Sequence, residues 1–280
     1  MFALPRLALA QAPAGTMKQD AATSGKTDVA SEGFASAADN KHADDSTEAK
    51  IQAGALGASG NSRSLALTSM ATVSARRGEN ELSAAAAANY GRSAAKAGDP
   101  MQTTIENYQG KLRYDRFLTD RFSVFTSLSG RRDRFQGLDL RLNLDPGLAY
   151  YFIQDPKHQL WGEAGYDLQY DIRRNAAIAA AFVATGDLLD KTKVRHSARL
   201  FAGYKNNLNE NVQFNTGVEY LQGLPDTQYW RFNWDVGLSA AIATRFSLAT
   251  TFSLRYDNAP LAGIKSTDTL TALNLVYTLL

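Results

Sequence analysis

The sequence predicts an all-β protein: a closed antiparallel up-and-down transmembrane β-barrel of twelve strands. Three observations predict it. Large apolar residues alternate with charged or small residues from Lys111 to Leu280, and a period of two is typical of strands whose two faces differ. The alternating segments are long for a β-sandwich, with aromatic residues towards their ends. Short and long connections between them tend to alternate, as in outer-membrane barrels.

Composition narrows the possible functions. The chain has 280 residues and no cysteine, which excludes disulfides, thiolate metal sites and cysteine nucleophiles. Its 30 Lys and Arg nearly balance its 28 Asp and Glu, and no basic block follows a nucleic-acid backbone, so we expect no nucleic-acid partner. No apolar run approaches the roughly 18 residues of a membrane helix. A membrane-spanning form of this chain would therefore use strands.

The first residues resemble the end of a secretion signal. Small residues recur in the steps Ala8-Leu9-Ala10 and Ala10-Gln11-Ala12, which a signal peptidase cuts. We interpret residues 1–12 as a truncated signal peptide, the alternative being a disordered alanine-rich start. Residues 13–46 are rich in Ala, Ser, Gly, Asp and Lys, too polar to bury a core. They are expected to form a disordered periplasmic linker before a barrel over residues 47–280.

Alternation and turn residues together place the twelve strands of the barrel. An even number lets a closed antiparallel barrel keep both termini on one side. The expected strands are Thr47 to Ser59, Arg63 to Ala75, Glu81 to Arg92, Thr103 to Leu118, Arg121 to Arg134, Leu138 to Ile153, Gln159 to Arg173, Val194 to Lys205, Asn211 to Leu221, Tyr229 to Ala243, Phe246 to Asp257 and Lys265 to Leu280.

The connections after even-numbered strands are brief and contain Gly, Asn, Asp or Pro. Several odd-numbered connections are longer, chiefly Asn175 to Lys193, although the first and third are short too. Short turns lie on the periplasmic side of such barrels, so we expect this long loop outside the cell. Its apolar stretch, Ala176 to Ala184, either extends beyond the membrane or folds inward as a constriction, and extension is the preferred interpretation.

The two faces of the strands follow from residue parity. One parity carries large apolar residues such as Phe122, Val124, Leu128 and Leu138, and we assign it to lipid. The opposite parity carries charges, Asp139 among them, and we assign it to the lumen. The alternative is a soluble β domain whose apolar parity faces an internal core.

Basic and acidic residues on the inward parity nearly cancel. Mixed charges on neighbouring strands favour ion-pair networks that brace a narrow pore over a one-signed selectivity filter. The residues expected to line the lumen, as a possible pore, are Lys111, Arg113, Arg131, Arg141, Glu163, Asp167, Arg195, Arg199, Glu219, Arg231, Asp235 and Arg255.

A catalytic role was tested on the three histidines. His42 lies in the linker and His158 in a turn, which leaves His196 beside Ser197. Neighbouring residues of a strand point to opposite faces, so this serine and histidine cannot act as a nucleophile and its base. The sequence contains no phosphate-binding glycine loop, metal-ligand cluster or cofactor motif. We therefore expect no catalytic, cofactor-binding or metal site, and no enzyme activity.

The residues also resemble a known family. The resemblance rests on four segments: Gly54 to Ser62, Arg131 to Arg134, Pro146 to Tyr150, and Trp161 to Tyr166. From about Ile51 onward the chain resembles the "domain of unknown function 481" family of Gram-negative outer-membrane proteins, often labelled salt-induced. The resemblance implies an outer-membrane β-barrel and no reaction. Such barrels usually end in an aromatic residue read by the barrel-assembly machinery, whereas this chain ends in Leu280.

These observations lead to one functional hypothesis and two alternatives. The hypothesis is an outer-membrane barrel of a Gram-negative bacterium, of structural or narrow-pore type, that passes small solutes if its lumen is open. Its expected partners are outer-membrane lipid and the barrel-assembly machinery, and it needs no cofactor. The alternatives are a lipid-acting outer-membrane enzyme and a soluble extracellular β domain.

Overall fold

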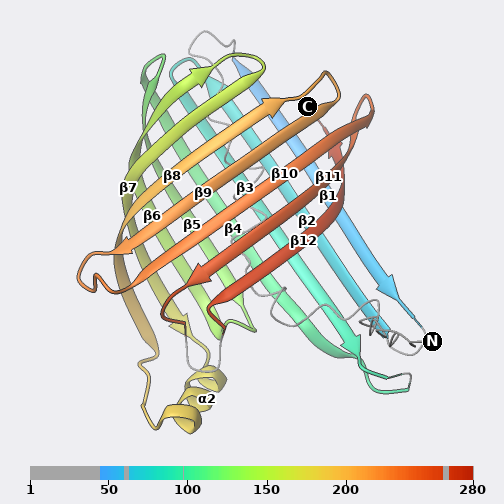
Figure 1. The fold of residues 1–280 in the computed structure, drawn as a ribbon, viewed down its shortest axis with the longest axis vertical. Coiled ribbons are helices and arrows are strands. Elements are labelled where there is room, and N and C mark those ends of the chain that lie inside the picture. Colours follow the sequence, from blue (N-terminus) through green and yellow to red (C-terminus); the bar gives the residue numbers. More distant parts are fainter. Residues whose placement is uncertain (1–44, 60–62, 97, 261–264, 280) are drawn as a thin grey trace, which may run out of the picture.

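The computed structural model describes residues 45–59, 63–96, 98–260 and 265–279. Within them, twelve antiparallel strands form one closed barrel in which each strand pairs with its neighbours in sequence and β1 pairs with β12 (Figure 1). The predicted fold class and strand number are confirmed. The predicted signal peptide and all but the last two residues of the predicted linker lie outside the described residues.

The observed strands agree with the predicted ones to within about two residues at most ends, since their limits coincide with the turn residues. They are β1 (Ser46–Ala58), β2 (Arg63–Arg77), β3 (Asn80–Ala94), β4 (Gln102–Thr119), β5 (Phe122–Asp133), β6 (Leu138–Gln154), β7 (His158–Arg173), β8 (Thr192–Asn207), β9 (Val212–Gly223), β10 (Trp230–Ala243), β11 (Phe246–Asp257) and β12 (Thr267–Thr278).

The two ends of the barrel differ in their connections. Short turns, 78–79, 120–121, 155–157, 208–211 and 244–245, join the strands at the end where β1 begins and β12 ends. Connections at the other end include 95–101, 174–191, 224–229 and 258–266, whereas 59–62 and 134–137 are short. We call these the turn end and the loop end. The predicted asymmetry is confirmed for the described residues.

The turn after β6 shows how local chemistry ends a strand. Asp155 Oδ1 accepts hydrogen bonds from the backbone N–H groups of His158 and Lys157, at 2.6 and 2.9 Å. Because these bonds favour the carboxylate, they hold the pKa of the Asp155 carboxyl below its ordinary value. The side chain thereby replaces backbone partners that the reversing chain cannot supply.

The long connection between β7 and β8 contains a helix that the sequence analysis did not predict, α2 (Asn175–Thr185). It lies beyond the ends of the strands, so the connection extends away from the barrel and does not fold inward (Figure 1). Alanine is the strongest helix former, and Gly186, at φ 78°, ends the helix in the left-handed region. Among the described residues, no helix has the length and apolar character needed to cross a membrane.

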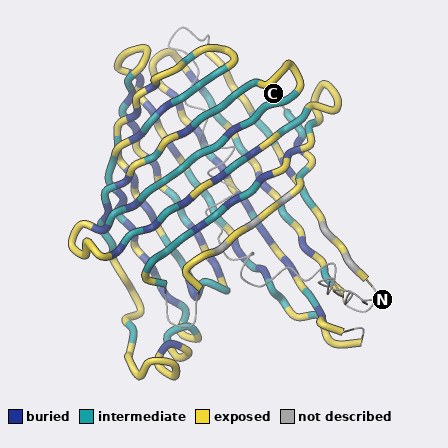
Figure 2. The backbone as a smooth tube through the Cα atoms, in the orientation of Figure 1, coloured by how far each residue is buried: buried dark blue, intermediate teal, exposed yellow. Residues whose placement is uncertain are grey.

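Buried and exposed residues alternate along the strands (Figure 2). The exposed positions are apolar and the buried positions polar, which inverts the arrangement of a soluble protein. Exposed large apolar residues on the strands include Leu112, Leu128, Leu142, Leu144, Leu148, Tyr150, Leu200, Trp234, Leu238, Leu248, Leu273 and Leu275. A face of this extent needs lipid around it, so the barrel is a transmembrane one.

The predicted faces of Leu138 and Asp139 are wrong. The β6 register shifts between Leu138 and Leu140, against β7, and a bulge of this kind reverses the parity of the residues before it. Leu138 is consequently buried inside the barrel. Asp139 instead lies at the loop end and pairs with Lys191 at 3.0 Å and with Arg174 at 3.6 Å.

A substitution at Leu128 tests whether the apolar outer face contacts lipid or water. This residue is half exposed and lies near the middle of β5, opposite Leu112 and Leu144. In a lipid-facing position, Leu128→Arg should lower the free energy of unfolding by about 2–4 kcal/mol. Urea unfolding of the protein refolded into phosphatidylcholine vesicles measures this change.

The matched control is Leu208→Arg. Leu208 has the same exposure, 50%, as Leu128 but lies in the turn 208–211. Its substitution should change stability by no more than about 0.5 kcal/mol. Equal small effects at both positions would contradict a lipid-facing role for Leu128.

Candidate functional site: the polar lumen

The twelve residues predicted to line the lumen carry inward-facing side chains, because they are buried or half-buried in a closed barrel. Eleven of them border two adjoining internal cavities. The twelfth, Asp167, is buried against Asn143, whose Nδ2 donates to it at 2.7 Å. The structure therefore brings these residues, from eight strands, into one lumen.

A charge network crosses the lumen between β4, β7, β8 and β9. Arg113 donates to Asp115 and to Glu163 at 2.8 Å. Arg199 donates to the other oxygen of Glu163 and to Glu219, each at 2.7 Å. Glu163 is thus shared by two guanidinium groups. We call these five residues the central network.

Opposite charges alternate along the central network, which offsets the cost of removing them from bulk water. Two neighbouring side chains also interact with the charged groups of the network. Asn233 Nδ2 donates to Glu219 at 2.6 Å, and the Arg113 guanidinium lies over the Phe125 ring, 4.0 Å from its centroid. The network ties four strands together across the interior and narrows the lumen.

Three further ion pairs lie between the central network and the loop end. Their short hydrogen bonds leave each carboxylate matched with one guanidinium. The pairs are Arg255 with Asp235, Arg131 with Asp133, and Arg141 with Asp171, each with a contact of 2.6 Å.

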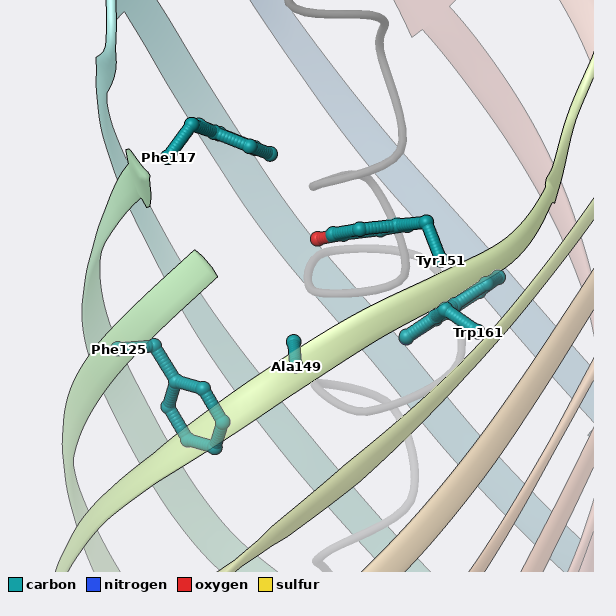
Figure 3. Packing of buried hydrophobic residues seen from close by; sticks show 5 residues of the cluster. All are labelled: Phe117, Phe125, Ala149, Tyr151 and Trp161. Carbon is teal, nitrogen blue, oxygen red and sulfur yellow. The ribbon is translucent and has the colours of Figure 1, made fainter. Parts of the chain in front are cut away.

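Aromatic side chains on β4, β5, β6 and β7 lie inside the barrel on the other side of the network, towards the turn end. Phe117, Phe125, Tyr151 and Trp161 form a buried cluster with Ala149 (Figure 3). The rings of Phe117 and Tyr151 stack with centroids 5.9 Å apart. We call these four rings the aromatic layer.

Two inward glycines make space for the aromatic layer. A Cβ on Gly203 would collide with the Trp161 ring, and one on Gly147 would lie 2.6 Å from Phe125 Cζ. Sequence analysis missed the layer because it treated the inward parity as uniformly polar. The available signal was four large rings on that parity, all within a few residues of a short turn.

Two small cavities, of about 80 and 90 Å³, lie among the described residues of the lumen. The first adjoins the central network and the second opens towards the loop end. They share Arg131, Arg141, Asn233 and Arg255 in their walls. Each is large enough for several water molecules, so together they form a narrow polar path from the loop end to the central network.

The candidate serine and histidine lie on opposite faces of β8. His196 Nδ1 forms a hydrogen bond with the Tyr166 hydroxyl, whereas Ser197 is fully buried inside the barrel. This arrangement gives the serine no adjacent base from His196. In the part of the chain that the structure describes, no group of three or more His, Asp or Glu side chains is placed to hold a metal ion.

The barrel has an apolar outer face and a charged lumen, and the sequence of the chain also matches a family model. Residues 51–279 match the model of a family described as "Protein of unknown function, DUF481". The chain belongs to the DUF481 family. The resemblance inferred from its residues is confirmed. A comparison of this DUF481 chain with curated proteins gives no match.

Solved structures similar to this DUF481 barrel include three membrane barrels. The KdgM porin is 8% identical with a TM-score of 0.45, over 84% of this chain and 100% of its own. An outer membrane channel from Pseudomonas putida F1 is 10% identical with a TM-score of 0.45, over 85% and 96%. The translocator domain of autotransporter NalP from Neisseria meningitidis is 14% identical with a TM-score of 0.42, over 83% and 86%. Similarity of this degree does not extend to a shared function.

Sequence analysis of the DUF481 chain also missed two buried arginines. Arg76 lies at the turn end with its guanidinium 4.3 Å from the centroid of the Phe117 ring, and Arg173 borders the cavity at the loop end. Both stand at the last residues of strands, where parity alone does not separate the lumen from the rim. Their inward direction depends on the local course of the backbone.

Glu163→Gln tests the contribution of the central network. The substitution removes the charge that Arg113 and Arg199 share, and it leaves two buried guanidinium groups with one carboxylate each. Breaking a buried charge pair is costly, so we expect the free energy of unfolding to fall by about 3 kcal/mol. Urea unfolding in detergent micelles measures it.

Glu106→Gln is the control for this experiment. Glu106 pairs with Arg134 at 3.1 Å, and that arginine side chain is half exposed. An exposed pair contributes about 0–1 kcal/mol. If Glu163→Gln destabilised the barrel no more than Glu106→Gln, the central network would not brace the lumen.

Proposed function

We propose that this protein is a narrow-pore channel in the outer membrane of a Gram-negative bacterium, passing small polar solutes through the barrel. Its partners in this proposal are the surrounding outer-membrane lipid and the barrel-assembly machinery that inserts it. The exposed apolar face supports a membrane address, and the short turns support a periplasmic turn end and an extracellular loop end.

One observation carries the proposal: the two adjoining cavities have walls of charged and amide side chains. The interior of a small barrel can be filled completely by side chains, which leaves no space for solute. Here the polar groups enclose space for water from the loop end to the central network. Water and small hydrogen-bonding solutes are the natural occupants of such space.

The path narrows at the central network and then meets the aromatic layer. Phe117 and Tyr151 are fully buried, and their rings present apolar surface on the turn-end side of the central network. An apolar constriction of this kind controls permeation by excluding water. In this proposal the aromatic layer therefore sets the small conductance of the pore.

A lipid-acting enzyme is less well supported, because Ser197, the serine next to His196, is buried inside the barrel and faces away from it. A soluble β domain is opposed by leucines and aromatic residues exposed along the strands. The proposal thus keeps two forms of one architecture, an open pore and a closed structural barrel.

Tyr151→Ala distinguishes these two forms. Tyr151 is fully buried in the aromatic layer, whereas the neighbouring Tyr150 is 43% exposed on the outer face of the same strand. Removing the Tyr151 ring should widen the constriction and raise the single-channel conductance in planar bilayers by about twofold or more, as expected when an apolar gate is opened.

Tyr150→Ala removes the same ring from the lipid face and should leave conductance unchanged. The unmodified protein should show small, stepwise openings. If neither it nor Tyr151→Ala conducts, the barrel is structural and the pore proposal fails. If both tyrosine variants raise conductance equally, the effect comes from barrel instability and the aromatic layer is not the constriction.

A further inference from the structure

The cavity at the loop end has an excess of positive charge. Its walls include six arginines but only two carboxylates, Asp171 and Asp257. Three of the arginines belong to the ion pairs already described. The other three are Arg173, Arg195 and Arg231, at the loop-end termini of β7, β8 and β10.

None of these three guanidinium groups has a carboxylate within hydrogen-bond distance in the described part of the barrel. Arg173 Nη1 donates to the backbone oxygen of Asp190 at 3.0 Å. Arg195 stacks on the Tyr229 ring, 3.7 Å from its centroid. Arg231 Nη2 forms a longer ion pair, at 3.7 Å, with Asp167 Oδ1, beyond hydrogen-bond distance.

Arg231 is the most informative of the three. It is 4% exposed, and its Nε and Nη2 atoms are buried without a hydrogen-bond partner. Arg195 Nε is likewise buried and unsatisfied. Buried charged donors without acceptors are costly, and an oxyanion in the cavity would supply the acceptors that they lack.

The nearby carboxylates do not supply them. Asp171 accepts two hydrogen bonds from Arg141, at 2.6 and 2.7 Å, and another from Gln169. Asp257 accepts from the backbone N–H of Ala259 and from the Tyr229 hydroxyl. Neither of them accepts a hydrogen bond from Arg173, Arg195 or Arg231. Asp171 is neutralised by Arg141, and the remaining charge of Asp257 is smaller than that of the three arginines, so the cavity keeps a net positive charge.

Tyr229 holds the arrangement in place. It is 3% exposed, and its ring contacts Arg195 and lies 5.7 Å from the Arg231 guanidinium. An aromatic ring beside two guanidinium groups orients them without neutralising their charge. The donors are therefore positioned before any ligand arrives, which lowers the cost of binding.

We infer that Arg173, Arg195 and Arg231 form a binding site for the carboxylate or phosphate group of a small solute at the loop-end mouth. Guanidinium groups bind both oxyanions through paired hydrogen bonds. The cavity of about 90 Å³ admits a small anionic group and not a folded chain. The inference deepens the proposed function, on which it rests for the role of this site in selecting solutes.

Equilibrium binding tests the site without requiring an open pore. The full chain, folded in detergent micelles, is titrated by isothermal calorimetry with inorganic phosphate and, separately, with succinate in a chloride buffer of constant ionic strength. We expect saturable binding of at least one probe, and the stronger of the two identifies the preferred oxyanion. Arg231→Gln and Arg195→Gln should each weaken it roughly tenfold or more, as expected for loss of a charged hydrogen-bond donor.

Arg132→Gln is the matched control. Arg132 follows Arg131 on β5 but points outward and is exposed, so its loss removes the same charge from the same end of the barrel without touching the cavity. The Arg132→Gln protein should bind the probe with the same affinity as the unmodified protein. Heat-modifiable migration on a gel establishes that each variant is folded, and Arg173→Gln replaces any variant that is not.

Failure of the site and failure of the pore give different results. No saturable binding of either probe, or an equal loss in Arg132→Gln and the cavity variants, overturns the site whatever the conductance. Binding that the cavity variants abolish supports the site even in a barrel that does not conduct. In a conducting barrel, the probe should also reduce current through the unmodified protein and not through Arg231→Gln.

Discussion

Backbone hydrogen bonding is the constraint on which the rest of this structure depends. Lipid offers no partner to an N–H or C=O group, so a strand can cross a membrane only when both of its edges are paired. Here β1 closes on β12 through the pairs from Lys50 with Thr278 to Ala53 with Leu275. Closure then divides every strand into an outward face, which must be apolar, and an inward face, which is free to be polar. The exposure of apolar residues and the burial of polar residues both follow directly from closure of the barrel.

A polar interior creates a second problem, because charges removed from bulk water must be paired or hydrated. The barrel solves it differently along its length. Around Glu163 the charges alternate and satisfy one another, and towards the turn end Phe117 and Tyr151 replace polar groups with rings. At the loop end, Arg195 and Arg231 keep buried donors without acceptors, as Arg76 does at the turn end beside the Phe117 ring. The lumen therefore contains three environments: paired charges, aromatic rings, and a group of arginines at the loop end whose donors are not all satisfied.

The period of two was sufficient to predict strands, faces and most lumen residues, because side-chain direction in a regular strand depends on parity alone. It failed where the backbone is irregular: a bulge moves Leu138 inward and Asp139 to the rim. Parity also does not predict which charged side chains form ion pairs with one another. The sharing of Glu163 between Arg113 and Arg199 depends on the register of strands far apart in sequence, which the sequence pattern does not contain. Helix α2 escaped notice because a long connection was treated as lacking structure of its own.

The distribution of charge along the barrel axis matters more than its sum. Counted over the whole inward parity, acids and bases nearly cancel, and a cancelled total favours a satisfied lining over a binding site. The register separates them: Asp115, Glu163 and Glu219 gather at the central network, whereas Arg173 and Arg195 face the loop end. An anion entering from the loop end would first meet guanidinium groups that have no hydrogen-bonded carboxylate, and then the ion pairs of the central network. To move further, the anion would have to displace a carboxylate side chain of the central network from its arginine. The arginines at the loop end therefore attract an anion, whereas those of the central network, already paired with carboxylates, do not bind it.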